Sequence, residues 1–127
     1  KVIQLNFTLN NKFKNKSGQI KIEPKFELSH KKDNDKIIVN LSFRIKNSKS
    51  PFFLDVILSG LFEFDFDTND EDMDKVVSIN MSSILFPFLR EIVSDVTTRG
   101  GFSPLLLPPI NFVEAYHKKQ EIESKSK

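Results

Sequence analysis

Residues 37–45 alternate between two kinds of side chain without a break, and this pattern constrains the fold more than any other feature of the chain. The apolar series is Ile37, Val39, Leu41, Phe43 and Ile45, with Ile38, Asn40, Ser42 and Arg44 between its members. A period of two residues is typical of a β-strand with one buried face. Such a strand needs partner strands and a covering layer. The segment therefore predicts a sheet with one face packed on a core.

Three further segments have a related pattern. Residues 2–13 carry Ile3, Leu5, Phe7 and Leu9 at alternate positions, residues 20–28 pass Pro24 into Phe26 and Leu28, and residues 52–66 end in alternating phenylalanines. Proline cannot donate to a ladder, so Pro24 indicates a strand edge or bend. The polar run 30–36 is expected to be a hairpin loop, and residues 14–18 and 47–51 to be turns. Four sequential strands with short connections predict an antiparallel meander.

Helical spacing begins only in the second half of the chain. Apolar residues from Leu85 to Val96 recur at helical intervals, and Pro87 is acceptable in a first turn, so this helix is expected to begin near Ser82 or Ser83. Gly100 and Gly101 then end it. The acidic residues 68–75 are expected to form a loop with one helical turn, capped by Thr68 or Asp70.

After an extended proline-rich segment, Asn111 is expected to cap a last helix over residues 112–122. The fold class is thus α+β, with a four-stranded antiparallel sheet followed by two helices. We expect one domain over residues 1–127, in which residues 1–67 form the sheet, residues 68–122 the helical part and residues 123–127 a flexible tail.

The chain has no cysteine. Disulfides, thiolate chemistry and cysteine-based zinc sites are therefore excluded, and a reducing compartment, the cytoplasm, is expected. The longest strongly apolar stretch, residues 52–62, is interrupted by Asp55 and Gly60 and is too short to span a bilayer, so no membrane insertion is expected. The chain begins with Lys1, and its native N-terminus is left open.

Residues that could support catalysis are few, and the sequence predicts no enzyme, cofactor or metal. His30 and His117 lie in polar surroundings 87 positions apart. The acidic cluster of residues 65–74 lacks the glycine and the terminal glutamate of a calcium loop. Gly100 and Gly101 follow a helix, whereas phosphate-binding glycines precede one.

Charge is distributed unevenly along the chain. Residues 1–50 contain eleven lysines and one arginine against four acids, a net charge of +8, whereas residues 51–127 carry −6. The basic half makes a single-stranded nucleic-acid-binding module the alternative from another class. However, Phe7 and Phe26 are in phase with aliphatic neighbours, as core residues are, so the lysines are read as a solvated face and no nucleic-acid partner is predicted.

Residues 84–112 contain three motifs in a fixed order. They are Ile-Leu-Phe-Pro-Phe-Leu-Arg-Glu at 84–91, Thr-Arg-Gly-Gly-Phe at 98–102, and Leu-Leu-Leu-Pro-Pro-Ile-Asn-Phe at 105–112. In order and spacing they resemble the signature of the SecB protein-export chaperones. The order of four strands before two helices agrees with this resemblance, although residues 1–30 match only weakly.

The resemblance implies an ATP-independent chaperone, a holdase that binds unfolded polypeptides such as precursors awaiting export. It implies that the binding groove lies along the second strand, the loop between the helices and the last helix. The corresponding residues here are Ile22, Phe26, Leu28, Phe102, Leu105, Leu106, Leu107, Phe112 and Tyr116. For Phe26 and Leu28 a core position is equally open, whereas Leu105–Leu107 are expected at the surface because prolines bracket that loop.

The resemblance also implies partner surfaces. Export members dock the SecA translocase motor on acidic residues of the first and fourth strands, and Phe53 and Asp55 preserve the fourth-strand pattern. The first strand contains no acid and has Asn6, Asn10 and Asn11 instead. A SecB-like chaperone dedicated to an antitoxin is therefore the alternative client class, and the sequence does not choose between them.

The first helix is apolar on more than one side, which predicts an oligomer. The resemblance implies a homotetramer built as a dimer of dimers. We expect Leu89, Ile92 and Val96 to contribute to contacts between or beneath the paired helices.

Overall fold

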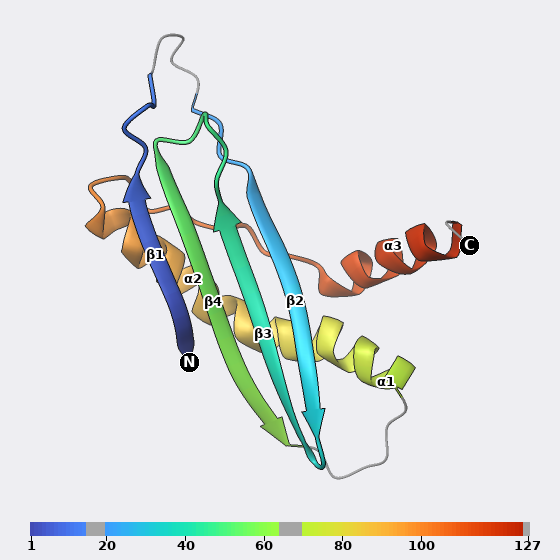
Figure 1. Cartoon of the computed structure of the whole chain (residues 1–127). Helices are drawn as coiled ribbons and strands as arrows, with labels where there is room; N and C mark the ends of the chain where they lie inside the picture. The colour runs from blue at the N-terminus through green and yellow to red at the C-terminus, as the bar shows by residue number, and fades with distance from the viewer. Residues whose placement is uncertain (15–19, 64–69, 126–127) are drawn as a thin grey trace.

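The computed structural model describes residues 1–14, 20–63 and 70–125. Four strands are followed by one long helix and a final helix (Figure 1). The elements are β1 (Val2–Leu9), β2 (Pro24–Asp33), β3 (Lys36–Ile45), β4 (Phe52–Glu63), α1 (Asp70–Lys75), the π-helical η1 (Val76–Met81), α2 (Ser82–Arg99) and α3 (Phe112–Lys125). The α+β class, with an antiparallel sheet before the helices, is confirmed.

The four strands form one sheet in the order β1-β4-β3-β2, with every neighbouring pair antiparallel. Strands β2, β3 and β4 form the predicted meander, but the meander is wrong for β1, which pairs with β4. Phe7 of β1 lies opposite Leu54, and its ring stacks on Phe52 with centroids 5.4 Å apart. In this position beside β4, Phe7 packs half-buried against the core.

Three strand boundaries differ from expectation. The second strand begins at Pro24 and not at Ile20. The first strand ends at Leu9 and not at Phe13, because Asn10 starts a turn: its Nδ2 donates to the carbonyl oxygens of Ser48 (3.1 Å) and Ser50 (2.8 Å). The second strand continues to Asp33, so the loop expected over residues 30–36 shrinks to a turn at Asn34, whose φ is 56°. The polar residues 30–33 can still pair with β3, because the hydrogen bonds between strands are made by backbone groups and do not depend on the side chains.

Helix α2 begins at Ser82, as predicted, but two helical segments lead directly into it, of which the sequence predicted only one turn within residues 68–75. Through α1 and η1, helical structure is continuous from Asp70 to Arg99, with Pro87 in its interior. Met73, Val77 and Met81 are buried, which shows that an apolar stripe on the sheet already exists before α2. Tertiary packing of this stripe outweighs the one hydrogen bond that Pro87 removes. The expected cap Thr68 lies outside the described residues.

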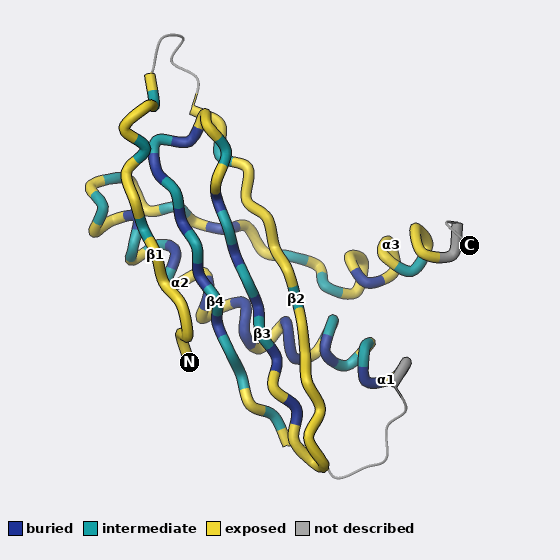
Figure 2. The backbone as a smooth tube through the Cα atoms, viewed as in Figure 1, coloured by how far each residue is buried: buried dark blue, intermediate teal, exposed yellow. Residues whose placement is uncertain are grey.

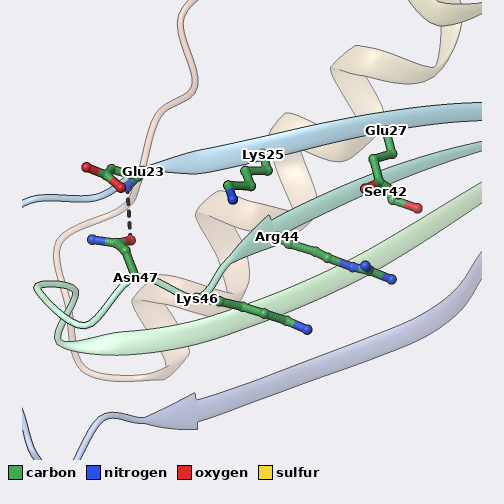
Figure 3. A pocket seen from close by; sticks show the side chains of 7 residues that line it. All are labelled: Glu23, Lys25, Glu27, Ser42, Arg44, Lys46 and Asn47. Carbon is green, nitrogen blue, oxygen red and sulfur yellow. Dashed lines mark hydrogen bonds between the residues drawn. The ribbon is translucent and has the colours of Figure 1, made fainter.

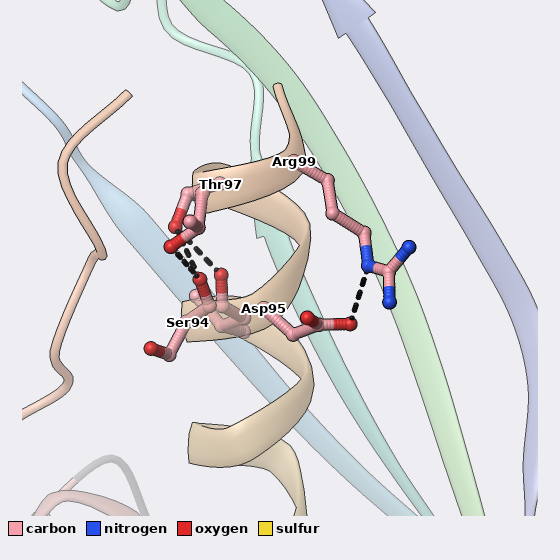
Figure 4. Close-up of polar contacts among 6 residues, drawn as sticks. Ser94, Asp95, Thr97 and Arg99 are labelled. Carbon is pink, nitrogen blue, oxygen red and sulfur yellow. Dashed lines mark hydrogen bonds and ion pairs between the residues drawn. The ribbon is translucent and has the colours of Figure 1, made fainter. Parts of the chain in front are cut away.

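The end of α2 is as predicted. Arg99 is its last residue, and Gly100 and Gly101 follow, with φ of +90° at Gly101. Polar contacts close the last turn (Figure 4): Thr97 Oγ1 donates to the carbonyl oxygen of Ser94 at 3.1 Å, and Arg99 Nε donates to Asp95 Oδ2 at 3.0 Å. The same Thr97 Oγ1 accepts the backbone N–H of Leu105 at 2.9 Å, which fixes the segment that leads to α3.

Asn111 caps α3 as predicted, since its Oδ1 accepts the backbone N–H of Glu114 at 3.0 Å. The helix continues to Lys125, so residues 123–125 are helical and are not part of a tail. Earlier in the helix, Lys118 and Glu114 form an i,i+4 ion pair that supports it.

The core lies between the sheet and the long helix. Figure 2 shows β3 and β4 alternating between buried and partly buried residues, while β1 and β2 are mostly exposed. The fully buried side chains include Ile37, Val39, Phe43, Ile45, Leu54, Val56, Val77, Leu89 and Val93. The outer face of the sheet has no helix over it in the described part of the chain (Figure 1). This half-covered sheet is what residues 37–45 predicted.

One helical segment, Asp72–Arg99, is long and apolar enough by length and composition to cross a membrane. The sequence expectation considered residues 52–62 and missed this segment, because the acidic start of the helix conceals its length. Its buried residues pack on the sheet, and core helices of water-facing domains pass the same criterion.

Candidate functional site

An apolar groove lies between the edge strand β2 and helix α3. We call it the β2–α3 groove; its cavity volume is about 630 Å³. It is lined by Phe26, Glu27, Leu28, Leu41, Ser78, Ser82, Ile110, Phe112, Ala115, Tyr116 and Lys119. These residues come from β2, β3, the long helix, α3 and, in the case of Ile110, the segment that leads into α3, so the groove forms only when all these parts are in place.

Packed aromatic rings form the centre of the groove wall. Phe26 meets Phe43 of β3 edge to face with centroids 5.1 Å apart, and it lies 6.3 Å from Phe86 of α2. Phe86 in turn meets Phe112 of α3 edge to face at 5.6 Å. The series connects the sheet to α3 through α2. Phe26 is 39% exposed although its ring packs against two other rings, so it presents a fixed apolar surface to the groove.

Two hydroxyl groups in the wall are engaged within the chain. Ser82 Oγ donates to the carbonyl oxygen of Val77 at 3.0 Å, and the hydroxyl of Tyr116 accepts from Gln120 Nε2 at 3.0 Å. Groups that are satisfied internally have less to offer a ligand. The groove therefore discriminates mainly by apolar contact and shape, with Glu27 and Lys119 as the charged residues along it.

The groove unites four of the nine residues that the sequence assigned to it: Phe26, Leu28, Phe112 and Tyr116. Phe102 lies elsewhere, at centroid distances of 5.1 Å from Phe52 and 6.3 Å from Phe7. Ile22 and Leu105 pack, half-buried, against the core.

The expectation that Leu105–Leu107 are all at the surface is wrong for Leu107. Its side chain is 4% exposed, whereas that of Leu106 is 69% exposed. The prolines make this segment extended, and in an extended segment successive side chains point to opposite sides. Since the segment crosses the covered side of the sheet, Leu107 enters the core and Leu106 faces solvent.

The helix residues expected between chains are also partly internal. Leu89 is fully buried against the sheet, and Ile92 and Val96 are half-buried on the same core. Leu89 therefore lies beneath the helix, which is one of the two placements expected for it, and its side chain presents no surface to another chain. Ile84 and Phe88, which are more than half exposed, occupy the outward positions of the helix.

Phe53 and Asp55 lie on the outer face of the sheet, away from the groove. Asp55 Oδ1 accepts from Arg44 Nε at 3.2 Å, and its Oδ2 accepts from Gln4 Nε2 at 3.1 Å. Figure 3 shows Arg44 in a shallow depression of about 360 Å³, together with Glu23, Lys25, Glu27, Ser42, Lys46 and Asn47. Both signs of charge are present, so this face is not a uniformly acidic surface.

Within the described ranges, no group of three or more histidine, cysteine, aspartate or glutamate side chains could hold a metal ion. The groove contains two charged side chains and no histidine. Its chemistry is that of a binding surface.

Comparison with known proteins identifies the relatives of this arrangement. A family model described as preprotein translocase subunit SecB matches residues 6–123. The chain belongs to the SecB family. It is 37% identical over 91 residues to the protein-export protein SecB of Neisseria meningitidis, a match covering 72% of this chain and 61% of that protein. For the SecB of Nitrosomonas europaea the identity is 36% over 89 residues, which cover 69% and 55%.

The chain thus spans about three fifths of the length of these SecB relatives. Among solved structures, it is similar to a SecB-like chaperone of Mycobacterium tuberculosis in complex with a ChAD peptide from an antitoxin. The TM-score is 0.73, the identity is 19%, and the match covers 87% of this chain and 86% of the other. This likeness supports the SecB fold.

Sequence reasoning missed several lining residues of the groove in this SecB chain: Leu41, Ser78, Ser82, Ile110, Ala115 and Lys119. One signal could have found two of them. Ile110 precedes the cap Asn111 and Ala115 is four positions after it, the two places whose side chains commonly pack together at a helix start. Ser78 and Ser82 gave no such signal, because Ser78 belongs to the helical segment before α2 that the sequence did not predict and Ser82 was considered only as the start of the helix.

Proposed function

We propose that the chain is an ATP-independent holdase of the cytoplasm that binds unfolded polypeptide in the β2–α3 groove. The observation that carries the proposal is a preformed groove of about 630 Å³ whose walls are mainly apolar and aromatic. Such walls accept many sequences because they do not depend on matched polar groups. Membership of the SecB family supports the same function.

The groove of one chain is small for an unfolded client, since an unfolded segment loses conformational entropy on binding and needs many contacts to offset the loss. We propose that a homotetramer supplies several grooves to one client. The exposed apolar residues Ile84 and Phe88 on α2, and Val2, Leu5 and Leu9 on β1, support such an assembly.

The client class depends on partner surfaces. Precursors for export would require the SecA motor to dock, for which Phe53 and Asp55 are the candidate residues. Because Arg44 and Gln4 engage the Asp55 carboxylate, and Asn6 and Thr8 line the neighbouring depression, a motor that seeks free carboxylates would find few on this face. This favours the alternative of a dedicated partner, such as an antitoxin, over a general export role.

The decisive test is suppression of aggregation without nucleotide. A chemically unfolded, aggregation-prone protein is diluted into buffer, and light scattering is followed with and without a stoichiometric amount of tetramer. We expect the wild type to suppress scattering and Phe26→Ala to suppress it clearly less. Leu61→Ala is the matched control, since Leu61 is an exposed apolar residue on the outer face of the sheet.

If the wild type leaves scattering unchanged, the holdase proposal fails. A parallel titration with single-stranded RNA at physiological salt tests the basic half. RNA binding at micromolar strength without polypeptide binding would replace the holdase with a nucleic-acid module.

A further inference from the structure

Three segments at one end of the sheet carry a cluster of lysines, which we call the basic end. The segments are residues 10–14, 20–23 and 46–51, and they extend beyond the layer of helices (Figure 1). Their lysines, all exposed, are Lys12, Lys14, Lys21, Lys46 and Lys49. Glu23 is the one acid in these segments, so their net charge is +4. Glu23 pairs with Lys21 at 3.0 Å, and in the described part of the chain no ion pair neutralises the other four.

Two asparagines hold the segments of the basic end together. Asn10 Nδ2 donates to two backbone carbonyl oxygens of the segment 46–51. Asn47 Nδ2 donates to the carbonyl oxygen of Lys21, and Asn47 Oδ1 accepts the backbone N–H of Glu23 at 3.1 Å (Figure 3). The backbones that carry the lysines are therefore held close to one another, although the lysine side chains repel.

Acidic residues are concentrated elsewhere in the molecule. Asp72 and Asp74 belong to α1, which lies in the half of the molecule away from the basic end (Figure 1). The residues from 51 onward carry a net charge of −6. An extended anionic surface would attract the basic end and repel the acidic part, so this separation of charge orients the chain on such a surface.

The side chains of the basic end suit a lipid surface. All five cations are lysines, which attract as point charges, whereas arginine is the residue that binds one carboxylate or phosphate through two hydrogen bonds. Ile20, beside Lys21, is 53% exposed, and an exposed aliphatic side chain among lysines can enter the headgroup layer of a membrane. Bases of single-stranded nucleic acid stack on exposed aromatic rings, but Phe13, the aromatic residue of these segments, is half-buried.

We propose that the basic end binds the surface of a membrane that contains anionic lipids. The lysines lie against the headgroups, Ile20 enters between them, and no segment crosses the bilayer. Each lysine near an anionic surface contributes about fivefold to the affinity. No residue that lines the β2–α3 groove belongs to the basic end, so the membrane contact leaves the groove free.

The test is sedimentation of the intact protein with vesicles. Vesicles of phosphatidylcholine alone are compared with vesicles that also contain phosphatidylglycerol. We expect binding only to the anionic vesicles, with an affinity that falls as salt rises. Combining Lys12→Glu with Lys49→Glu should weaken binding by about 25-fold or more. Ile20→Ser should weaken it by a factor that persists at high salt, because that contact is apolar.

The matched control combines Lys31→Glu with Lys75→Glu, which changes the net charge equally on β2 and α1, away from the basic end. Both of these lysines are exposed. We expect binding to weaken by less than about threefold. Circular dichroism checks that both double variants are folded. The Lys12→Glu, Lys49→Glu variant should still suppress aggregation as the wild type does, so the lipid proposal and the holdase proposal are tested separately.

Two results with vesicles would overturn the proposal: no binding to anionic vesicles at physiological salt, or equal losses in the two double variants. A polyglutamate peptide and a single-stranded RNA are titrated in parallel at the same concentration of negative charge. Tighter binding of either polymer than of the anionic vesicles, lost in the Lys12→Glu, Lys49→Glu variant, would assign the basic end to an acidic polypeptide or to RNA instead.

Discussion

The ring of Phe7 in β1 lies directly against the α-carbon of Gly100, where helix α2 ends. A Cβ built on Gly100 would overlap the ring edge of Phe7, whereas a Cβ on Gly101 would meet nothing within 4 Å. Gly101 instead has a φ of +90°, a backbone conformation that residues other than glycine rarely adopt. The two adjacent glycines are thus required for different reasons, one for space and one for backbone conformation.

Gly100→Ala should lower the free energy of unfolding by about 1–3 kcal/mol, because the extra methyl group overpacks the site of Phe7. In a Phe7→Leu background the loss should become smaller. Gly101→Ala is the matched control: its loss of about 1–2 kcal/mol comes from the backbone and should be the same in both backgrounds. Urea unfolding of the four variants measures this, and additive effects of Phe7→Leu and Gly100→Ala would contradict it.

The half-buried Arg44–Asp55 pair should contribute more to stability than the exposed Asp95–Arg99 pair on α2. The Asp55 side chain is 16% exposed, against 57% for Asp95. A double-mutant cycle with Arg44→Met and Asp55→Asn should give a coupling of about 1 kcal/mol, which decreases as salt rises. The corresponding cycle at Asp95 and Arg99 should give about 0.3–0.5 kcal/mol. Equal couplings at the two sites would refute the prediction.

Phe88→Asp and Leu89→Asp, at neighbouring positions of α2, should have different effects: the first on the oligomer and the second on the fold. Phe88 is 56% exposed, so Phe88→Asp should leave a folded chain and lower the native mass from that of the proposed tetramer toward monomer or dimer. Leu89 is fully buried, so an aspartate there should cost several kcal/mol and unfold the chain. Circular dichroism and light scattering separate the outcomes. A folded tetramer of Phe88→Asp would place the interface elsewhere.

Asn40 on the central strand β3 offers a route to a more stable chain. Its Oδ1 is buried and accepts no hydrogen bond within the described residues. Removing an unsatisfied buried acceptor should raise the free energy of unfolding, so Asn40→Val is expected to gain about 1 kcal/mol. Ser42→Val, on the same strand and face, controls for the β-propensity of valine. A gain of equal size at Ser42 would show that propensity alone is responsible.

The sequence predicted local structure well where one period dominates. Residues 37–45 form β3, the helix ends at Gly100, and Asn111 caps α3. Predictions from the sequence were wrong where tertiary packing determines the structure. β1 pairs with β4 because the core beneath Phe52 accepts Phe7, and no local pattern carries that information. The helix passes through Pro87 because buried residues on either side hold it to the sheet.

The candidate site was predictable only in part. The residues of the β2–α3 groove that came from the family resemblance, such as Phe26 and Tyr116, do lie together. Phe102 and Leu107 do not, because the extended segment after α2 crosses the covered side of the sheet and directs its side chains to opposite sides. Burial of an individual side chain in such a segment depends on how the segment lies, which spacing alone does not reveal.

The long helix crosses the sheet diagonally, from the β2 edge at α1 to the β1 edge at the end of α2 (Figure 1). Near one edge it contributes Ser78 and Ser82 to the β2–α3 groove, and near the other it contributes Phe88 and Ile92 to the hollow beside Val2. Residues of one continuous helical segment thus line both surfaces. A change in how this segment lies on the sheet would alter the shape of both surfaces at once.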